Sequence, residues 1–286
     1  MRSTLKITSA MKLVASSKLH KAQKAIEALR PYEDALERIL AAASASPESS
    51  LAGAQDDGTA VRTEKASPSI VLAFASNSSM CGAFNATAAA KALEIGFGSD
   101  HEVEYWSFGK KMSDALRKAG RTPARDYSNV VAHPSFEAVA EIATELRGMY
   151  GAGEISGVTL VYNRFVSVGR HDVVAEDFFS SVNPSPAVLG GHPVVLSGSE
   201  GSAAEDYIIE PSARELLDAM VPQVLNTKLY AALLDSAASE HAARMIAMQA
   251  ATDNAQDLLA ELSLEYNKGR QQKITAEILD LAGATE

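Results

Sequence analysis

The sequence predicts an α/β fold in which the N-terminal and C-terminal helices form a long antiparallel coiled coil and a small α/β domain is inserted between them. Three observations support this fold class. Both ends of the chain show helical apolar spacing with almost no glycine, the middle alternates strand-like and helix-like runs, and two stretches rich in Ser, Gly and Pro separate these parts. The 286 residues, 47% of them apolar, are enough to bury a core.

Residues 1–44 are predicted to form the N-terminal coiled-coil helix, because they contain no glycine and a single proline, Pro31. Apolar residues follow a spacing of three and four that is interrupted only at Glu33. This apolar seam consists of Ala15, Leu19, Ala22, Ile26, Leu29, Leu36 and Leu40. A proline inside a helix removes one hydrogen bond, so we expect a bend near Arg30 but not the end of the helix.

A small Rossmann-like α/β domain is predicted for residues 69–181, between flexible links at 45–68 and 182–205. The run "SIVLAF" at 69–74 is continuously apolar and has the length of a strand. Further strands are expected at 102–109, 157–167 and 171–181, and helices at 82–94, 110–120 and 135–150. This alternation predicts a small sheet that ends in an antiparallel pair of strands at its edge.

Residues 206–286 are predicted to be the C-terminal coiled-coil helix, with Pro211 in its first turn. Its seam alternates spacings of four and three without interruption over Leu234, Ala238, His241, Met245, Met248, Thr252, Ala255, Leu259, Leu262 and Tyr266. The nearest helical partner is the N-terminal helix, packed antiparallel. The expected shape is a stalk that carries a globular domain.

The two helices also allow a prediction of register. We assume that the N-terminal helix ends near Ser44, beside the start of the C-terminal helix near Pro211. If both helices rise equally per residue, they pair residues whose numbers sum to about 255, which places Met11 opposite Arg244. Met1 then lies opposite Asn254, although the seam continues to Tyr266 and would face water there. About a dozen further residues before Met1 would cover this stretch. We therefore hypothesise that the natural chain begins upstream of Met1.

The charge distribution narrows the possible partners. The formal net charge of −10 argues against general nucleic-acid binding. Residues 1–30, however, hold seven basic side chains and one acidic one, which favours an acidic partner; a solvated helix face is the alternative. The single cysteine, Cys81, excludes an internal disulfide and fits a reducing compartment. No apolar run reaches about eighteen residues, so we expect no direct membrane insertion.

The turn after the first strand, "ASNSSMCGAFNAT", is where a dinucleotide-binding fold would place its glycine-rich phosphate loop, but it contains one glycine, Gly82. Cys81 is expected to be a small buried residue, and His241 a packed residue of the seam. The six histidines show no metal-ligand spacing. We therefore predict no catalytic residue, no cofactor-binding residue and no metal ligand.

Several segments resemble the gamma subunit of F-type ATP synthase. They are "KITSAMKLVASSKLHKAQ" near the start, "MCGAFN" and "YIIEPS" in the interior, and the block from "SEHAARMIAMQ" to "ILDLAGA" at the end. The resemblance covers essentially the whole chain in the right order. It implies a central rotor stalk with no active site of its own, which couples ion flow through the membrane rotor to ATP synthesis or hydrolysis at the beta subunits by rotation.

The resemblance also implies partners and a location. The partners are the alpha and beta subunits of the catalytic hexamer, the epsilon subunit and the c-subunit ring of the membrane rotor, with no nucleic acid. No transit peptide is visible, so the implied location is peripheral, on the cytoplasmic side of a bacterial inner membrane. No cofactor is implied for this chain.

Contact residues carry over only where the motifs match. The implied contacts to the catalytic subunits are Lys6, Met11, Arg244, Arg270, Gln271 and Thr275, and the implied contact to the membrane rotor ring is Glu210. The family usually has a basic residue and a glycine before the Cys-Gly pair. This chain has Ser79 and Met80 there, so any role of that basic residue is absent.

Two other interpretations remain open at this point. A standalone coiled-coil adaptor would form a stable homodimer, whereas a rotor needs its hexameric partners. A cofactor-binding α/β enzyme with helical arms would be stabilised by its nucleotide. Co-purification with alpha and beta subunits and ligand-dependent melting distinguish the three.

Overall fold

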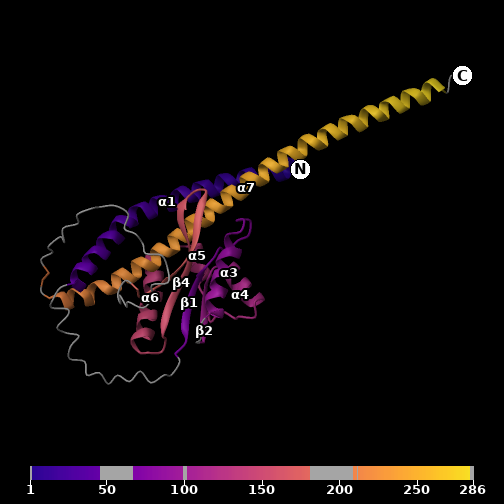
Figure 1. Ribbon diagram of the computed structural model, residues 1–286. Coiled ribbons are helices and arrows are strands. Elements are labelled where there is room, and N and C mark those ends of the chain that lie inside the picture. Colours follow the sequence, from indigo (N-terminus) through magenta and orange to yellow (C-terminus); the bar gives the residue numbers. More distant parts are fainter. Residues whose placement is uncertain (1, 46–66, 99–101, 181–208, 211, 284–286) are drawn as a thin grey trace.

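The computed structural model of the chain describes residues 2–45, 67–98, 102–180, 209–210 and 212–283. Its two longest elements are α1 (Arg2–Ala45) and α7 (Ala213–Gly283), which pack side by side in opposite directions (Figure 1). The remaining described elements form a domain against one side of this pair, and α7 continues far past the N-terminal end of α1. The predicted fold class is confirmed. Apart from Ala45, Ser67 and Pro68, the expected links at 45–68 and 182–205 lie outside the described residues.

Helix α1 is continuous through Pro31, as the sequence predicted, and its course curves in Figure 1. The predicted seam is the face that meets α7. Its members Ala15, Leu19, Ile26, Leu36 and Leu40 are all buried. The seam of α1 is therefore confirmed as the apolar contact of the coil.

The described helix α7 begins at Ala213, and Pro211, which the sequence analysis placed in the first turn, lies outside the described residues. Ser212 directly precedes it, and its hydroxyl accepts a hydrogen bond of 3.3 Å from the backbone N–H of Glu215. A serine at this position satisfies one of the unpaired amides of the first turn and so favours the start of the helix.

The register of the coil differs from the predicted one near the N-terminus of α1. The Thr252 hydroxyl donates to the Thr8 hydroxyl at 2.9 Å, and Lys12 Nζ donates to Gln249 Oε1 at 2.6 Å. Each pair lies about five residues further along α7 than the prediction placed it. The prediction assumed that the C-terminal end of α1 lies directly beside the N-terminal end of α7. The register is instead set by the interlocking of the seam side chains.

The described sheet has the strand order β3-β2-β1-β4-β5. The strands are β1 (Ser69–Phe74), β2 (Val103–Phe108), β3 (Arg125–Asp126), β4 (Gly157–Ser167) and β5 (Arg170–Asp177). β1 pairs in parallel with β2 and β4, and β3 pairs in parallel with β2. β5 pairs antiparallel with β4 at the edge, which confirms the predicted edge pair.

The domain also contains four described helices: α3 (Phe84–Phe97), α4 (Lys110–Lys118), α5 (Ser128–Ala132) and α6 (Phe136–Gly151). The sequence analysis missed β3 and α5. Both are too short for a repeating apolar pattern, so local periodicity carries no signal for them.

The sheet is covered on both faces, and α7 is one of the covering helices. Ile70 and Phe74 of β1 pack on the face that holds α6 and α7, while Val71 packs on the face that holds α3 and α4. Leu225 and Leu229 of α7 are part of the first of these two cores. Helix α7 therefore belongs both to the coil and to the core of the domain. Among the described helices, none combines the length and apolarity needed to cross a bilayer.

Candidate functional site

Helix α7 has a stretch with no partner inside the chain, which we call the free tip (residues 260–279). Every side chain in this stretch is exposed. Its large apolar side chains are Leu262, Leu264, Tyr266, Ile274, Ile278 and Leu279. Arg270, Gln271 and Thr275, which the resemblance implies as contacts, also lie here, and the Thr275 hydroxyl donates to the Gln271 carbonyl at 2.9 Å. A long helix exposed on all sides presents both apolar and polar groups to a surrounding surface (Figure 1).

The point at which the seam becomes exposed was predicted only in part. Leu262 and Tyr266 face water, as expected, but Ala255 is buried and Leu259 is partly buried. The shifted register explains this difference, because α1 reaches further along α7 than the prediction assumed.

A second candidate region is a groove of about 300 Å³ between α1, α7 and the turn that follows β1. We call it the coil groove. It is lined by Ala10, Met11, Val14, Ala15, Lys18, Ser78, His241 and Arg244. Met11 and Arg244 both line this groove, but the observed register does not place them directly opposite each other as the sequence analysis predicted.

Arg244 has a role inside the chain that the sequence analysis missed. Its guanidinium pairs with Glu240 one turn earlier and donates to the Ser78 hydroxyl at 2.7 Å. It also donates to the carbonyl oxygens of Ser78 and Ser79, both at 3.4 Å. The side chains of Arg244 and Glu240 are each 11% exposed. Arg244 therefore fixes the turn after β1 to α7; its contact with a catalytic subunit stays a prediction.

The sequence indicates the ion pair between Glu240 and Arg244 but not the bonds of Arg244 to Ser78. Glu240 and Arg244 are four residues apart, the spacing of an ion pair along a helix. Ser78 is more than 160 residues away in the chain. Nothing in the local pattern connects the two segments.

The turn after β1 has an unusual backbone at Met80. Its φ is 67°, a conformation that favours glycine, and its side chain is exposed. This is the position at which the resembled family usually has a glycine. Cys81 next to it is buried and accepts a hydrogen bond of 3.0 Å from the Asn85 side-chain amide. The expectation of a small buried cysteine is confirmed.

His241 is half-buried on the seam, and burial lowers the pKa of its imidazole despite the nearby Glu240. The predicted packed seam histidine is confirmed. A neutral imidazole leaves Lys18 and Arg244 as the positive charges of the coil groove, whose remaining lining from α1 is apolar. Such a groove suits a segment that carries acidic and apolar side chains.

The carboxyl edge of the sheet, where nucleotide-binding folds hold phosphate, is occupied by the chain's own side chains. The backbone N–H of Ser76 donates to Asn85 Oδ1 at 2.9 Å, and that of Lys110 donates to Asn77 Oδ1 at 3.0 Å. These amides are therefore not free to bind a phosphate group.

The remaining predicted contacts lie far apart. Lys6 is exposed near the start of α1, and Glu210 is exposed just before α7 begins. The two residues thus lie toward opposite ends of the coil.

Comparison with known proteins identifies relatives along the whole chain. A family model described as ATP synthase matches residues 1–286. The ATP synthase gamma chain of Bacteroides thetaiotaomicron is 40% identical over 289 residues, which covers 99% of this chain and 95% of that protein. The gamma chain of Flavobacterium johnsoniae is 38% identical over 286 residues, with coverages of 99% and 93%.

Two solved structures share the fold. One belongs to the central stalk and c-ring of the Tetrahymena thermophila mitochondrial ATP synthase, with a TM-score of 0.59, 22% identity, and coverage of 86% of this chain and 99% of that chain. The other belongs to the Euglena gracilis mitochondrial ATP synthase, with a TM-score of 0.57, 18% identity and coverage of 94% of each chain. The family model and the sequence relatives go further than this structural similarity: the chain belongs to the ATP synthase gamma-chain family.

Proposed function

We propose that this chain is the central rotor stalk of an ATP synthase, which couples ion flow through a membrane rotor to ATP synthesis or hydrolysis by rotating inside the catalytic subunits. The observation that carries the proposal is the free tip of α7. Leu264 and Tyr266 on this tip are 69% and 71% exposed. A helix with exposed apolar side chains around its surface is stable in water only when partners surround it.

We assign the surrounding partners to the alpha and beta subunits of the catalytic hexamer. Arg270, Gln271 and Thr275 supply polar contacts on the tip, where no other part of the described chain competes for them. Lys6 and Met11 supply contacts along α1. Arg244 contributes through the shape and charge of the coil groove, because its guanidinium is already bonded within the chain.

The opposite end of the coil is assigned to the membrane rotor. Glu210 lies just before the start of α7 and is exposed, so it is available to the c-subunit ring while the free tip is held by the catalytic subunits. The epsilon subunit is assigned to the same end of the rotor. A stalk that is bound at both ends transmits torque from one to the other.

The chain is proposed to be non-catalytic. The amides of Ser76 and Lys110, at the edge of the sheet where a phosphate would bind, are already bonded to asparagine side chains. Nucleotide chemistry then belongs to the beta subunits. This chain contributes a rigid helical stalk, because the N-terminal part of α7 packs against both α1 and the sheet.

The proposed location is peripheral, on the cytoplasmic side of a bacterial inner membrane. Relatives from Bacteroides and Flavobacterium support a bacterial complex. Contact with the membrane is made through the c-subunit ring.

Co-purification tests the proposal. A tagged full-length chain, isolated from its own cell membranes with mild detergent, should recover alpha and beta subunits together with c-ring. A variant with Leu264→Asp and Tyr266→Asp should keep its fold, measured by circular dichroism, and lose most of this recovery. Isolation of a stable homodimer without alpha and beta subunits would support the adaptor instead.

Nucleotide binding tests the enzyme alternative. A ligand at a hundredfold excess over its Kd stabilises a protein by about 2.7 kcal/mol, which a melting experiment detects readily. We expect no shift with adenine or nicotinamide nucleotides. A shift of that size in the isolated chain would contradict the non-catalytic assignment.

A further inference from the structure

Charged side chains gather where α1, α7 and the β4–β5 hairpin meet, and the partner contacts of the stalk do not explain them. Glu33, the residue that interrupts the seam of α1, lies among them and is half-buried. The charged groups around it are Arg30, Asp34 and Glu37 on α1, Lys228 and Asp235 on α7, Arg164 on β4 and Glu176 on β5. We call this set the junction cluster.

The two arginines of the junction cluster are engaged with groups other than Glu33. Arg164 forms an ion pair with Glu176, and its guanidinium also donates to the Tyr162 hydroxyl at 3.3 Å. Arg30 donates to the carbonyl oxygen of Phe165 at 3.3 Å. Both cations therefore hold the hairpin in place.

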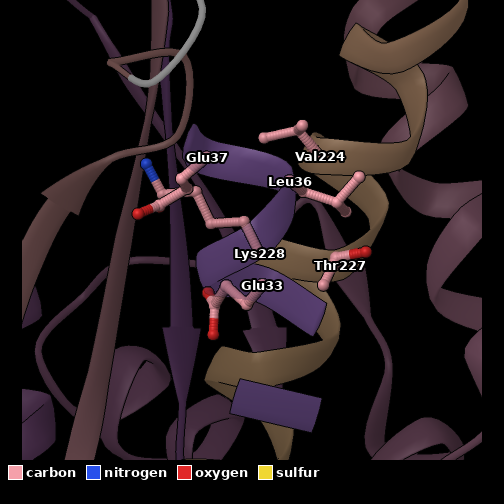
Figure 2. A pocket seen from close by; sticks show the side chains of 6 residues that line it. All are labelled: Glu33, Leu36, Glu37, Val224, Thr227 and Lys228. Carbon is pink, nitrogen blue, oxygen red and sulfur yellow. The ribbon is translucent and has the colours of Figure 1, made fainter. Parts of the chain in front are cut away.

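Lys228 also reaches the hairpin. Its ammonium group donates to the carbonyl oxygen of Asp177 at 2.7 Å and to the Ser180 hydroxyl at 3.0 Å. In Figure 2 the Lys228 side chain extends toward the Glu37 end of the small hollow between α1 and α7, whereas the carboxyl group of Glu33 points to the opposite end. The amine is thus directed away from Glu33. Burial lowers the pKa of Lys228, and the nearby carboxylates oppose this shift, Glu33 more weakly than Glu176, Asp177 and Glu37.

Glu33 itself makes no ion pair within 4 Å and no side-chain hydrogen bond to the part of the chain that the structure describes. Asp235 is similar, since one of its carboxylate oxygens is buried without a hydrogen-bond partner among the described residues. Burial, with added repulsion from Glu37 and Asp235, raises the pKa of Glu33 to about 7. Burial also raises the pKa of Asp235 to about 6, although Arg30 and Arg164 oppose this shift.

We propose that Glu33 is protonated when the junction is tightly packed, so that ionisation of this half-buried carboxyl group, which has no ion-pair partner among the described residues, weakens the contact of α1 with α7 and the hairpin. The neutral acid fits the half-buried seam. The carboxylate adds a charge that faces other carboxylates and lacks an ion-pair partner. The rotor therefore contains a pH-sensitive point where its coil joins its globular domain.

The direction of the pH dependence follows from the two states. In the unfolded chain Glu33 titrates near its ordinary value of 4.5, and in the folded chain it titrates at about 7. Between these values the folded chain binds a proton that the unfolded chain has lost. The contribution of Glu33 is fully present below pH 4.5 and is lost as the pH rises toward 7, by about tenfold in the folding equilibrium per pH unit. Above pH 7 it is constant.

Glu33→Gln in the full-length chain tests the proposal, because glutamine has nearly the shape of the protonated acid. Compared with wild type, the variant should show about tenfold or greater stability of the folded state at pH 8 and little difference at pH 5. Hydrogen exchange of peptides from residues 28–40, measured on both chains at the same pH, gives this ratio locally. Glu27→Gln is the matched control, because Glu27 is exposed on the same helix and is not among the charges that raise the pKa of Glu33. It should lack this pH-dependent gain.

A direct titration keeps the proposal testable if the variant folds poorly. The side-chain carboxyl carbon of Glu33 in the wild-type chain, followed by ¹³C NMR, should titrate with a midpoint near 7. A midpoint near 4.5, or a gain from Glu33→Gln that is equal at pH 5 and pH 8, would overturn the proposal.

Discussion

The paired part of α7 and its free tip are one continuous helix, yet they are stabilised in different ways. In the paired part, side chains such as Leu229 and Ala238 are completely buried, against the sheet and against α1 respectively. On the free tip, Leu264 and Tyr266 have no partner in the described chain. The paired part owes its stability to contacts within this chain, whereas the tip has none among the described residues and is proposed to bind partner proteins.

The comparison also shows what the apolar spacing of a helix specifies and what it leaves open. The apolar spacing of the seam runs from Leu234 to Tyr266 without a change of character. Burial along the same row ends after Leu259, where α1 no longer covers α7. The pattern of a seam therefore shows that a helix has partners, but not which protein supplies them.

The sharpest test of this comparison uses one substitution in both parts. Leu229→Ala removes a side chain from the core and should lower the free energy of unfolding of the isolated chain by about 2–5 kcal/mol. Leu264→Ala, the matched change on the tip, should alter it by less than about 0.5 kcal/mol. Urea unfolding followed by circular dichroism measures both values. Equal losses at the two positions would show that the tip is packed within the free chain.

An intermediate effect is expected at Met11, in the coil groove beside the paired part of α7. Met11→Lys adds a cation where an acidic partner segment is proposed, and an ion pair formed in one rotary position holds the rotor there. A pair worth about 1 kcal/mol slows departure from that position about fivefold. ATP-driven ion pumping per ATP hydrolysed by the assembled complex should fall, with assembly preserved.

Met11→Leu is the control for this experiment, because it keeps the apolar contact and should pump normally. Normal pumping by Met11→Lys would contradict the assignment of the coil groove to a catalytic subunit.

The smallest effect is expected at Met80, in the turn that Arg244 fixes to the paired part of α7. Met80→Gly relieves the backbone strain of a residue with a φ of 67°, which should raise the free energy of unfolding by about 1–2 kcal/mol. The greater conformational freedom of glycine in the unfolded chain partly offsets this gain. The variant should be more stable by about 0.5 kcal/mol in thermal unfolding. Ser79→Gly, at a neighbouring residue without positive φ, should instead lower the stability. A loss of stability in Met80→Gly would show that its side chain makes a favourable contact.

Much of this protein was determined by local sequence. The spacing of Leu19, Ile26 and their neighbours specifies a buried helical seam, because residues three and four apart share one face of a helix. The apolar run at 69–74 specifies a buried strand for a similar local reason. The family was also readable from the sequence, since long motifs at both ends of the chain carry it.

The tertiary structure decided what depends on residues far apart in the chain. The register of α1 on α7, the bonds of Arg244 to Ser78, and the short elements β3 and α5 have no local pattern that specifies them. Glu33 is the clearest case, because the sequence shows only an acidic residue that interrupts a seam. Burial in the folded junction is the main reason that the pKa of Glu33 is raised, with Glu37 on the same helix next, and Asp235 and Glu176, which folding brings near it from other elements, add to the shift. Helical and strand periodicity act over a few residues, whereas packing register and electrostatic surroundings exist only after distant segments have met.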